Sequence, residues 1–310
     1  MATYESLYGG YTGREAQIYH WFHEIPKEAP AIFALIMFAL LGLINLAITC
    51  KTRAWFMLTI AVTALLEVIG YACRIMMLHK PAFAPYIIMQ ALLIISPIFL
   101  ALVDYSATGK LMRMAHGGGR LHPAWVARGF FASDLLCLVI QGGGAGLSSS
   151  AKAGNLNSAK ALLIIGLILQ LACFTCFTGL TLYINLKRKY GLRGVKAFYP
   201  IFFCLYSTIA LMYIRSIFRL IEFIGGWLGY VATHESYFYC FDFLMIFLCF
   251  VIFTVFHFGF YLKKAQASLL DSAPQQEQVA IDGANPAFNA NKVAAMHAAV
   301  TSVPIQVQAV

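Results

Sequence analysis

Seven long apolar runs, each bounded by a short polar segment, occupy most of this chain. A helix needs about 20 mostly apolar residues to cross the hydrocarbon core of a bilayer, because it rises only about 1.5 Å per residue. Each run is long enough. The sequence therefore predicts an all-α membrane protein, a bundle of seven transmembrane helices. The expected spans are Pro30 to Cys50, Ala54 to Leu78, Pro85 to Met112, Pro123 to Leu147, Ser158 to Leu186, Ala197 to Ile224 and Tyr237 to Leu262.

The composition excludes an ordinary soluble domain. Of the 310 residues, 61% are hydrophobic and 11% are charged, and the mean hydropathy is +0.75. A soluble domain is about half apolar and about a quarter charged. The formal net charge of +9 lies mostly in short loops between the apolar runs, so we interpret it as a determinant of topology and expect no nucleic-acid partner.

Lysine and arginine are distributed unequally between the two sets of loops, and cytoplasmic loops usually carry the excess. The richer side holds Lys51, Arg53, Arg113, Arg120, Lys187, Arg188, Lys189, Arg193, Lys196, Lys263 and Lys264. The other side holds only Arg14, Lys27, Lys80 and Lys152. The sequence therefore predicts an N-terminus outside and a C-terminus in the cytoplasm.

This topology divides the chain into three parts. Residues 1–29 form an extracellular N-terminal segment, residues 30–262 form the seven-helix membrane domain, and residues 263–310 form a cytoplasmic tail. From Asp271 onward the tail is rich in Ala, Gln, Asn and Val, and it has no apolar stripe of helical period. Such a composition cannot bury enough apolar surface to fold, so we expect the tail to be largely disordered.

Charged side chains inside the sixth apolar run are the strongest indication of a site. An ionised residue at the centre of a bilayer costs about 2.5 to 3.5 kcal/mol on insertion scales, so such residues usually face protein or a water-filled cavity. Arg215, Arg219 and Glu222 follow one another at helical spacing and therefore share one face of the sixth helix. The sequence predicts that this face lines a site.

Other polar residues fall at the midplane or in the outer half of the expected spans. Their depth favours one polar cavity that opens toward the outer leaflet, with walls of both charges. Such a cavity suits an amphiphile that carries an amine and hydroxyl groups. The candidate substrate-binding residues are Glu67, Arg74, Gln90, Asp134, Gln141, Arg215, Arg219, Glu222 and Asp242.

The same residues have a structural interpretation, in which arginine and carboxylate pairs simply hold helices together. The expected spans also contain two helix-breaking motifs. The run Gly142-Gly143-Gly144 predicts a helix end, a broken helix, or a close approach of another backbone. Pro97 is expected to kink the third helix and to free a main-chain carbonyl.

A series of short motifs extends along the chain. They are Glu67 to Arg74, Gln90, Ser96-Pro97, Ser133-Asp134, Gln141 to Gly144, Gln170, Ile214 to Phe223, Gly226, Gly229, Glu235, Tyr239 and Phe241-Asp242. In these segments the chain resembles the fungal RTA-like proteins, also called lipid-translocating exporters. The resemblance covers about residues 30 to 262, and the order of the motifs across six helices is specific. One departure is His257-Phe258-Gly259, where many relatives have His-Pro-Gly.

The resemblance implies a seven-helix fungal membrane protein, with the plasma membrane as the expected location. Members of that family are linked to release of sphingoid long-chain bases, to resistance against toxic amphiphiles, which is a form of drug resistance, or to porphyrin uptake. We therefore expect translocation or export of an amphiphilic, lipid-like substrate, with membrane lipids as partners. The chain contains no G-x-x-x-x-G-K-[ST] motif, so we expect no ATP binding. Glu67 and Asp134 are candidate proton carriers.

Two other functions fit a seven-helix bundle. The first is a membrane receptor or sensor, although Arg113-Met114-Ala115 and the seventh run lack the usual receptor motifs. The second is an intramembrane hydrolase, which needs clustered metal ligands or a nucleophile with a base. His20, His23 and His234 could converge into such a cluster, but we favour a surface or loop role for them. We therefore expect no enzyme, no catalytic residue, no metal and no cofactor.

Overall fold

A computed structural model describes residues 13–22, 24–114, 123–149, 156–186, 196–226, 229–231 and 233–268. The described residues contain no strand, and seven helices are long and apolar enough to cross a membrane. The chain is thus an integral, multi-pass, all-α membrane protein, as predicted. The spans are Glu28–Thr52, Trp55–His79, Phe83–Met114, Trp125–Gly144, Asn157–Leu186, Lys196–Gly225 and Glu235–Val255. The predicted tail lies almost wholly outside the described residues.

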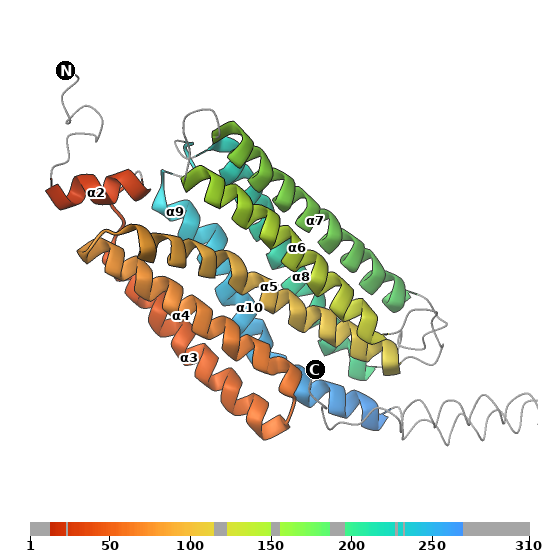
Figure 1. Cartoon of the computed structure of the whole chain (residues 1–310). Helices are drawn as coiled ribbons and strands as arrows, with labels where there is room; N and C mark the ends of the chain where they lie inside the picture. The colour runs from red at the N-terminus through yellow and green to blue at the C-terminus, as the bar shows by residue number, and fades with distance from the viewer. Residues whose placement is uncertain are drawn as a thin grey trace, which may run out of the picture.

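The helices run side by side in chain order and form one elongated bundle (Figure 1). The helices α3, α4 and α5 pack as successive neighbours, and α6 packs most closely on α7. The helices α8 and α10 lie behind α5 and α6 in Figure 1 and connect the two groups, because α8 contacts α5 and α7 while α10 contacts α3 and α8. The main helices are α3 (Glu28–Thr52), α4 (Leu58–His79), α5 (Phe83–Met114), α6 (Pro123–Ser149), α7 (Leu156–Leu186), α8 (Tyr199–Gly225) and α10 (Leu244–Val255).

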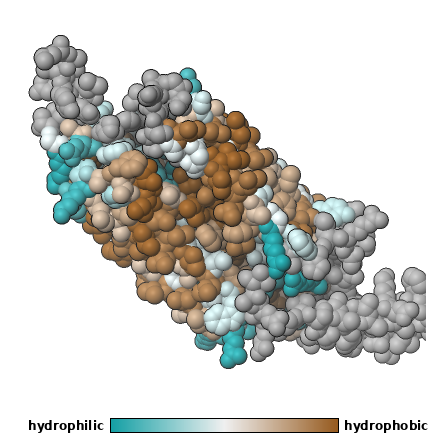
Figure 2. All heavy atoms as spheres, viewed as in Figure 1, coloured by the Kyte–Doolittle hydropathy of each residue, from teal (hydrophilic) through white to brown (hydrophobic). Residues whose placement is uncertain are grey.

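The surface of the bundle is apolar around its middle. Figure 2 shows a broad hydrophobic belt between hydrophilic residues at the two ends. Large apolar side chains of the spans are exposed, and Leu43 of α3 and Val139 of α6 are 66% and 63% exposed. A soluble monomer rarely exposes so large an apolar surface, so the belt is the face that contacts lipid.

An aromatic cluster fills the centre of the bundle between α3, α4 and the seventh span. Phe38 stacks on Tyr71 with ring centroids 5.8 Å apart and meets Phe243 and Phe250 edge-on at 5.5 and 5.4 Å. Aromatic pairs at these distances add about 0.5 to 1.5 kcal/mol each beyond the area that they bury. The cluster fixes the start of the seventh span against α4, and that start carries Asp242.

The glycine run does not interrupt α6, which continues as a helix to Ser149. A broken helix at these glycines is therefore wrong, whereas the predicted helix end at Leu147 lies within two residues of the end of α6. In addition, a Cβ atom at Gly144 would lie only 2.9 Å from the carbonyl oxygen of Ala159 in α7. The third interpretation, close approach of another backbone, therefore holds at Gly144.

The seventh span is less regular than the single helix predicted over Tyr237 to Leu262. It begins with the short helix α9 (Glu235–Phe238), widens into the π-helical turn η5 (Tyr239–Phe243), and ends with α10 at Val255. A second helical segment, residues 258–268, follows the break. Gly259 allows this segment to reach α3, because a Cβ atom there would lie 2.5 Å from Oγ1 of Thr52.

Candidate functional site

Arg219 and Asp242 form the centre of the site, and both side chains are buried. Nε of Arg219 donates to Oδ1 of Asp242 at 3.0 Å, and Nη2 donates to Oδ2 at 2.7 Å. Two parallel bonds of this kind make the strongest and most directional contact between a guanidinium and a carboxylate. The pair fixes α8 to η5.

Arg215, one turn away on α8, joins the same carboxylate and also reaches α5. Its Nε lies 2.9 Å from Oδ1 of Asp242, as an ion pair, and its Nη2 donates to the carbonyl oxygen of Leu93 at 2.9 Å. That carbonyl lies four residues before Pro97, which has no N–H to donate to it. The carbonyl group of Leu93 therefore lacks a donor within its own helix, as expected, and the buried guanidinium of Arg215 supplies the missing hydrogen bond.

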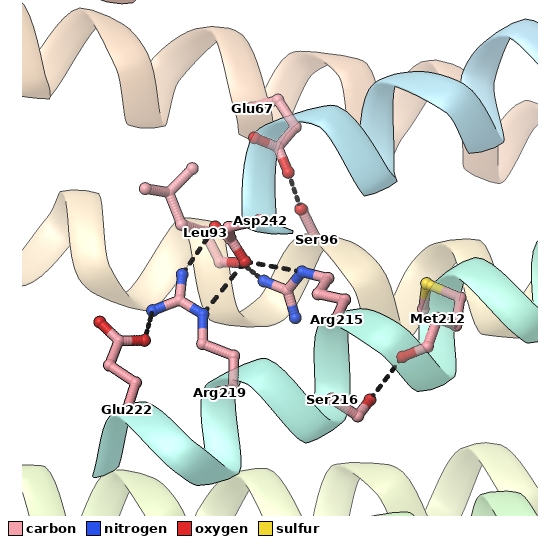
Figure 3. A network of polar contacts seen from close by, with 9 residues as sticks. All are labelled: Glu67, Leu93, Ser96, Met212, Arg215, Ser216, Arg219, Glu222 and Asp242. Atoms are coloured by element: carbon pink, nitrogen blue, oxygen red, sulfur yellow. Dashed lines mark hydrogen bonds and ion pairs between the residues drawn. The ribbon is translucent and has the colours of Figure 1, made fainter. Parts of the chain in front are cut away.

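Glu222 completes a network of four ionised side chains, shown in Figure 3. Its Oε2 lies 3.1 Å from Nη1 of Arg219, and its side chain is 22% exposed. We call Arg215, Arg219, Glu222 and Asp242 the charged quartet. Two arginines and two carboxylates balance one another, so the quartet is neutral as a unit.

Glu67 of α4 lies beside the quartet but is not part of it. It is fully buried, and one carboxylate oxygen accepts a hydrogen bond from the hydroxyl of Ser96 (Figure 3). The other oxygen, Oε2, has no hydrogen-bond partner among the described residues. Asp242, Arg215 and Arg219 are its charged neighbours, and they already balance within the quartet. A negative charge on Glu67 is therefore left without a partner.

The π-helical turn explains how Asp242 meets both arginines. Turns of this kind contain one residue more than an α-helical turn and are frequent at functional sites. Here the turn spans Tyr239–Phe243 and buries both Asp242 and Phe243, while its other residues stay partly exposed. The sequence pattern does not indicate this turn, because apolar and aromatic residues occupy both sides of the run.

Arg74 lies on α4 like Glu67 but belongs to a different network. Its Nη2 lies 3.0 Å from Oε1 of Glu235. Its guanidinium also lies over the rings of Phe22 and Phe238, at 5.1 and 4.7 Å from their centroids. The structure therefore does not bring Arg74 together with the quartet, because Arg74 is balanced by Glu235 and enclosed by aromatic rings.

The N-terminal segment closes over this second network. The helix α2 (Gly13–Phe22) lies across one end of the bundle in Figure 1, beside the ends of α4 and α9. The main-chain N–H of Lys27 donates to Oε2 of Glu235 at 2.9 Å, and the N–H of Glu235 donates to Oε2 of Glu24 at 2.7 Å. Burial raises the pKa of Glu24 above its ordinary 4.5, and the charge of Glu235 adds to the effect. We call Glu24, Lys27, Arg74 and Glu235 the clasp; the sequence did not predict it.

The remaining predicted residues occupy other helix interfaces. Asp134 of α6 accepts a hydrogen bond from the hydroxyl of Tyr105 at 2.6 Å. Gln141 donates to Gln170 at 2.9 Å, which joins α6 to α7, and Gln90 lies 3.4 Å from the hydroxyl of Tyr86 within α5. The structure therefore gathers Arg215, Arg219, Glu222, Asp242 and Glu67, and it separates Arg74, Asp134, Gln141 and Gln90 from them.

The hydrolase hypothesis gains no support from the described residues. Nδ1 of His234 lies 2.7 Å from the carbonyl oxygen of Tyr230, and no group of metal-ligating side chains occurs in the described ranges. His23 and the side chain of His20 lie outside the described residues.

Seven spans around a buried, self-balanced set of charges define a multi-pass membrane protein with a polar centre. The family model described as "RTA1 like protein" matches residues 60–265, which is more than half of the chain, so the chain belongs to the RTA1-like family. The match includes the whole quartet, Glu67, and Arg74 with Glu235. The resemblance found in the sequence is confirmed.

Three relatives come from Saccharomyces cerevisiae. An uncharacterised membrane protein is 30% identical over 194 residues, which cover 61% of this chain and 71% of the relative. Protoporphyrin uptake protein 1 is 31% identical over 199 residues, 62% of this chain and 65% of the relative. The sphingoid long-chain base transporter RSB1 is 26% identical over 309 residues, 86% of this chain and 78% of the relative. No solved structure gives a significant match.

Proposed function

We propose that this chain moves an amphiphile with a cationic head group, of the sphingoid long-chain base class, across the plasma membrane. The chain acts in this proposal as a translocator and not as an enzyme. Similarity to a sphingoid base transporter over 86% of the chain supports the substrate class. The apolar belt would keep the hydrocarbon tail in lipid while the head group passes between helices.

Glu67 is the observation that carries the proposal. It is a buried carboxylate whose Oε2 has no hydrogen-bond partner among the described residues, and the adjacent quartet is already neutral. An ammonium group beside Glu67 would balance the negative charge of this carboxylate. Hydrogen bonds between such ionised groups contribute about 1.5 to 3 kcal/mol, which is sufficient to select a cationic head over a neutral one.

The neutrality of the quartet disfavours an anionic substrate beside Glu67. A porphyrin carries carboxylates, which need free guanidinium or ammonium groups. Both arginines of the quartet are engaged by Asp242, and Arg219 also contacts Glu222. An anion would have to displace a buried carboxylate, and breaking a buried ion pair costs about 3 to 5 kcal/mol. We therefore favour the cationic class although one relative is named for protoporphyrin uptake.

The conformation described is closed around the site. Glu67 has no exposed surface, and Arg215, Arg219 and Asp242 are all buried. A head group would reach Glu67 only after helices separate at one end of the bundle. The clasp lies at the end that carries α2, so we propose that it opens before the substrate enters.

A reconstituted system tests this function. The purified protein in liposomes would be supplied with a labelled sphingoid base, and its movement between leaflets would be followed. Glu67→Gln keeps the shape of the side chain and removes its charge, so we expect a loss of at least about tenfold in rate, equivalent to about 1.4 kcal/mol. An N-acylated analogue has no ammonium group, so the parent protein and the Glu67→Gln variant should move it at the same rate.

Asp104→Asn is the matched control. Asp104 is also a buried carboxylate on a central helix, but the hydroxyl of Thr208 lies 3.1 Å from each of its oxygens. We expect this control to keep most of the rate. Unchanged transport of the base by Glu67→Gln would reject Glu67 as the head-group site, and no transport by the parent protein would reject the proposed function.

A further inference from the structure

A small pocket lies between α5, α6, α7 and α8, separate from the quartet. It has about 20 Å³ of open space, and about 10 to 15 Å³ is sufficient for one water molecule. Much of its wall is apolar and includes Pro97, Ala101 and Phe174. Its polar side chains come from four different helices. They are Tyr105, Asp134, Gln170 and Ser216.

Asp134 is the acidic group of this pocket and is only 2% exposed. Its Oδ2 accepts the hydrogen bond from Tyr105. Its Oδ1 is buried and has no hydrogen-bond partner among the described residues. Buried polar atoms in proteins are nearly always paired, with protein or with ordered water. An unpaired carboxylate oxygen beside a space for one water molecule therefore indicates a ligand.

No positive charge balances Asp134 in the described part of the chain. The ion pairs of the bundle involve Glu28, Glu222, Glu235 and Asp242, and none involves Asp134. The titratable groups that face it are Tyr105 of α5 and Cys137 of its own helix, with Asp104 of α5 and Cys173 of α7 beyond them. From α8 the pocket receives only Met212 and Ser216, which carry no charge. An isolated ionised carboxylate is very costly in this environment, so it needs a neutralising ligand.

We propose that this pocket is a proton-binding site, in which Asp134 carries an exchangeable proton on Oδ1 and a pocket water delivers it. In the uptake step, hydronium in the pocket loses one O–H bond and becomes water, while a new O–H bond forms on Oδ1. The carboxylate becomes a neutral carboxylic acid, and Tyr105 continues to donate to Oδ2.

A proton fits this pocket better than a metal cation does. A metal ion needs several oxygen ligands that point toward it, whereas the wall is largely carbon. Tyr105 already gives its hydroxyl hydrogen to Asp134, and the carbonyl oxygen of Gln170 already accepts from Gln141. Ser216 donates to the carbonyl of Met212. A proton needs only the one free oxygen of Asp134.

On both α5 and α8, a residue that lines the pocket is adjacent in the chain to a residue of the quartet or to the partner of Glu67. Pro97 adjoins Ser96, the partner of Glu67, and Ser216 follows Arg215 in the chain. A change in charge at Asp134 therefore acts on the part of α5 around Pro97 and on the turn of α8 that bears Arg215. If the proposed function holds, proton binding at Asp134 is coupled to lipid movement. The proton site itself does not require that function.

Infrared difference spectroscopy of the full-length protein in liposomes tests the site. At neutral pH we expect the protein to show a carboxylic-acid carbonyl band that shifts in D₂O and that Asp134→Asn removes. Asp104→Asn and Glu67→Gln are the controls, and each should leave this band in place. Tyr105→Phe should keep the band and move it to higher frequency, because the acid carbonyl loses its hydrogen bond.

The outcomes separate this inference from the proposed function, because the spectra are recorded without lipid substrate. Absence of any band that depends on Asp134 overturns the proton site even if transport is normal. Loss of the band when Na⁺ replaces K⁺ at constant pH would also overturn it, in favour of a metal cation. If Asp134→Asn does not fold, the band shift in Tyr105→Phe decides the question, and a missing shift counts against the site.

Discussion

Nη2 of Arg215 lies 2.9 Å from the carbonyl oxygen of Leu93, the carbonyl that Pro97 leaves without a helical donor. A defect in one helix is thus filled by a charged side chain from another. The contact explains why a proline and an arginine, far apart in the sequence, act together. It also fixes the direction of the guanidinium, which can then reach Asp242.

Replacing Pro97 should weaken the dependence of stability on Arg215. Pro97→Ala restores a main-chain donor for Leu93, so the arginine no longer supplies the needed bond. We expect Arg215→Ala to cost about 1.5 to 3 kcal/mol less in the Pro97→Ala background than in the parent protein. Unfolding in mixed detergent micelles measures the four members of this cycle. An equal cost in both backgrounds would show that the contact contributes nothing.

Removing the carboxylate of Asp242, which both arginines share, should lower stability far more than removing the partly exposed carboxylate of Glu222. Asp242→Asn removes the carboxylate charge that two buried guanidinium groups share, and we expect a loss of about 3 to 5 kcal/mol in the free energy of unfolding. Glu222→Gln is the matched control, because that carboxylate is partly exposed, and it should cost about 1 kcal/mol or less. The same micelle assay measures both, and similar losses would contradict a neutral quartet centred on Asp242.

The clasp should respond to pH through Glu24. Burial raises the pKa of Glu24. Glu24 therefore binds a proton more tightly when the N-terminal segment is docked on the bundle than when it is undocked. Docking is therefore favoured at acidic pH and weakens as the pH rises above 4.5 through the raised pKa. Spin labels at Glu15 and Lys80 would report the change as a broader distance distribution at higher pH.

Glu24→Gln provides the control for that experiment. The amide cannot ionise, so the distribution should stay narrow over the whole range and lose its dependence on pH. A parent protein whose distances do not change with pH would contradict this role of Glu24.

Two neighbouring glycines of α6 should respond oppositely to the same substitution. Gly144→Ala places a Cβ atom 2.9 Å from a carbonyl oxygen of α7, so the helices must separate, and we expect a loss of about 1 to 3 kcal/mol. Gly143 has open space around it, so Gly143→Ala should be neutral or stabilise by up to about 1 kcal/mol through helix propensity. Thermal unfolding in detergent compares them, and equal effects would argue against close packing at Gly144.

Thiol labelling tests the predicted orientation. Tyr230 is 67% exposed in the segment before α9, which we place outside the cell. Tyr230→Cys should therefore react with an impermeant thiol reagent on intact cells. Arg53→Cys, on an exposed residue between α3 and η1 (Trp55–Met57), should react only after the membrane is permeabilised. The reverse pattern would invert the topology.

The sequence was sufficient for what depends on one helix at a time. Length and hydropathy gave the spans, spacing placed Arg215 and Arg219 on one face, and the missing N–H of Pro97 predicted a free carbonyl. Partners on different helices were not predictable, because they depend on how each helix is rotated in the bundle. For that reason Arg74 and Asp134 were assigned to the same cavity as the quartet, and the clasp was not foreseen.

The extra residue in η5 has a consequence for the whole seventh span. One added residue shifts the angular phase of all later side chains by about 100°, since an α-helix turns by that angle per residue. Asp242 meets the arginines from within the turn, and the side chains of α10 that pack on α3 follow after it. Shortening the turn by one residue would rotate Asp242 relative to these side chains of α10, so the span would lose its contact with either the arginines or α3.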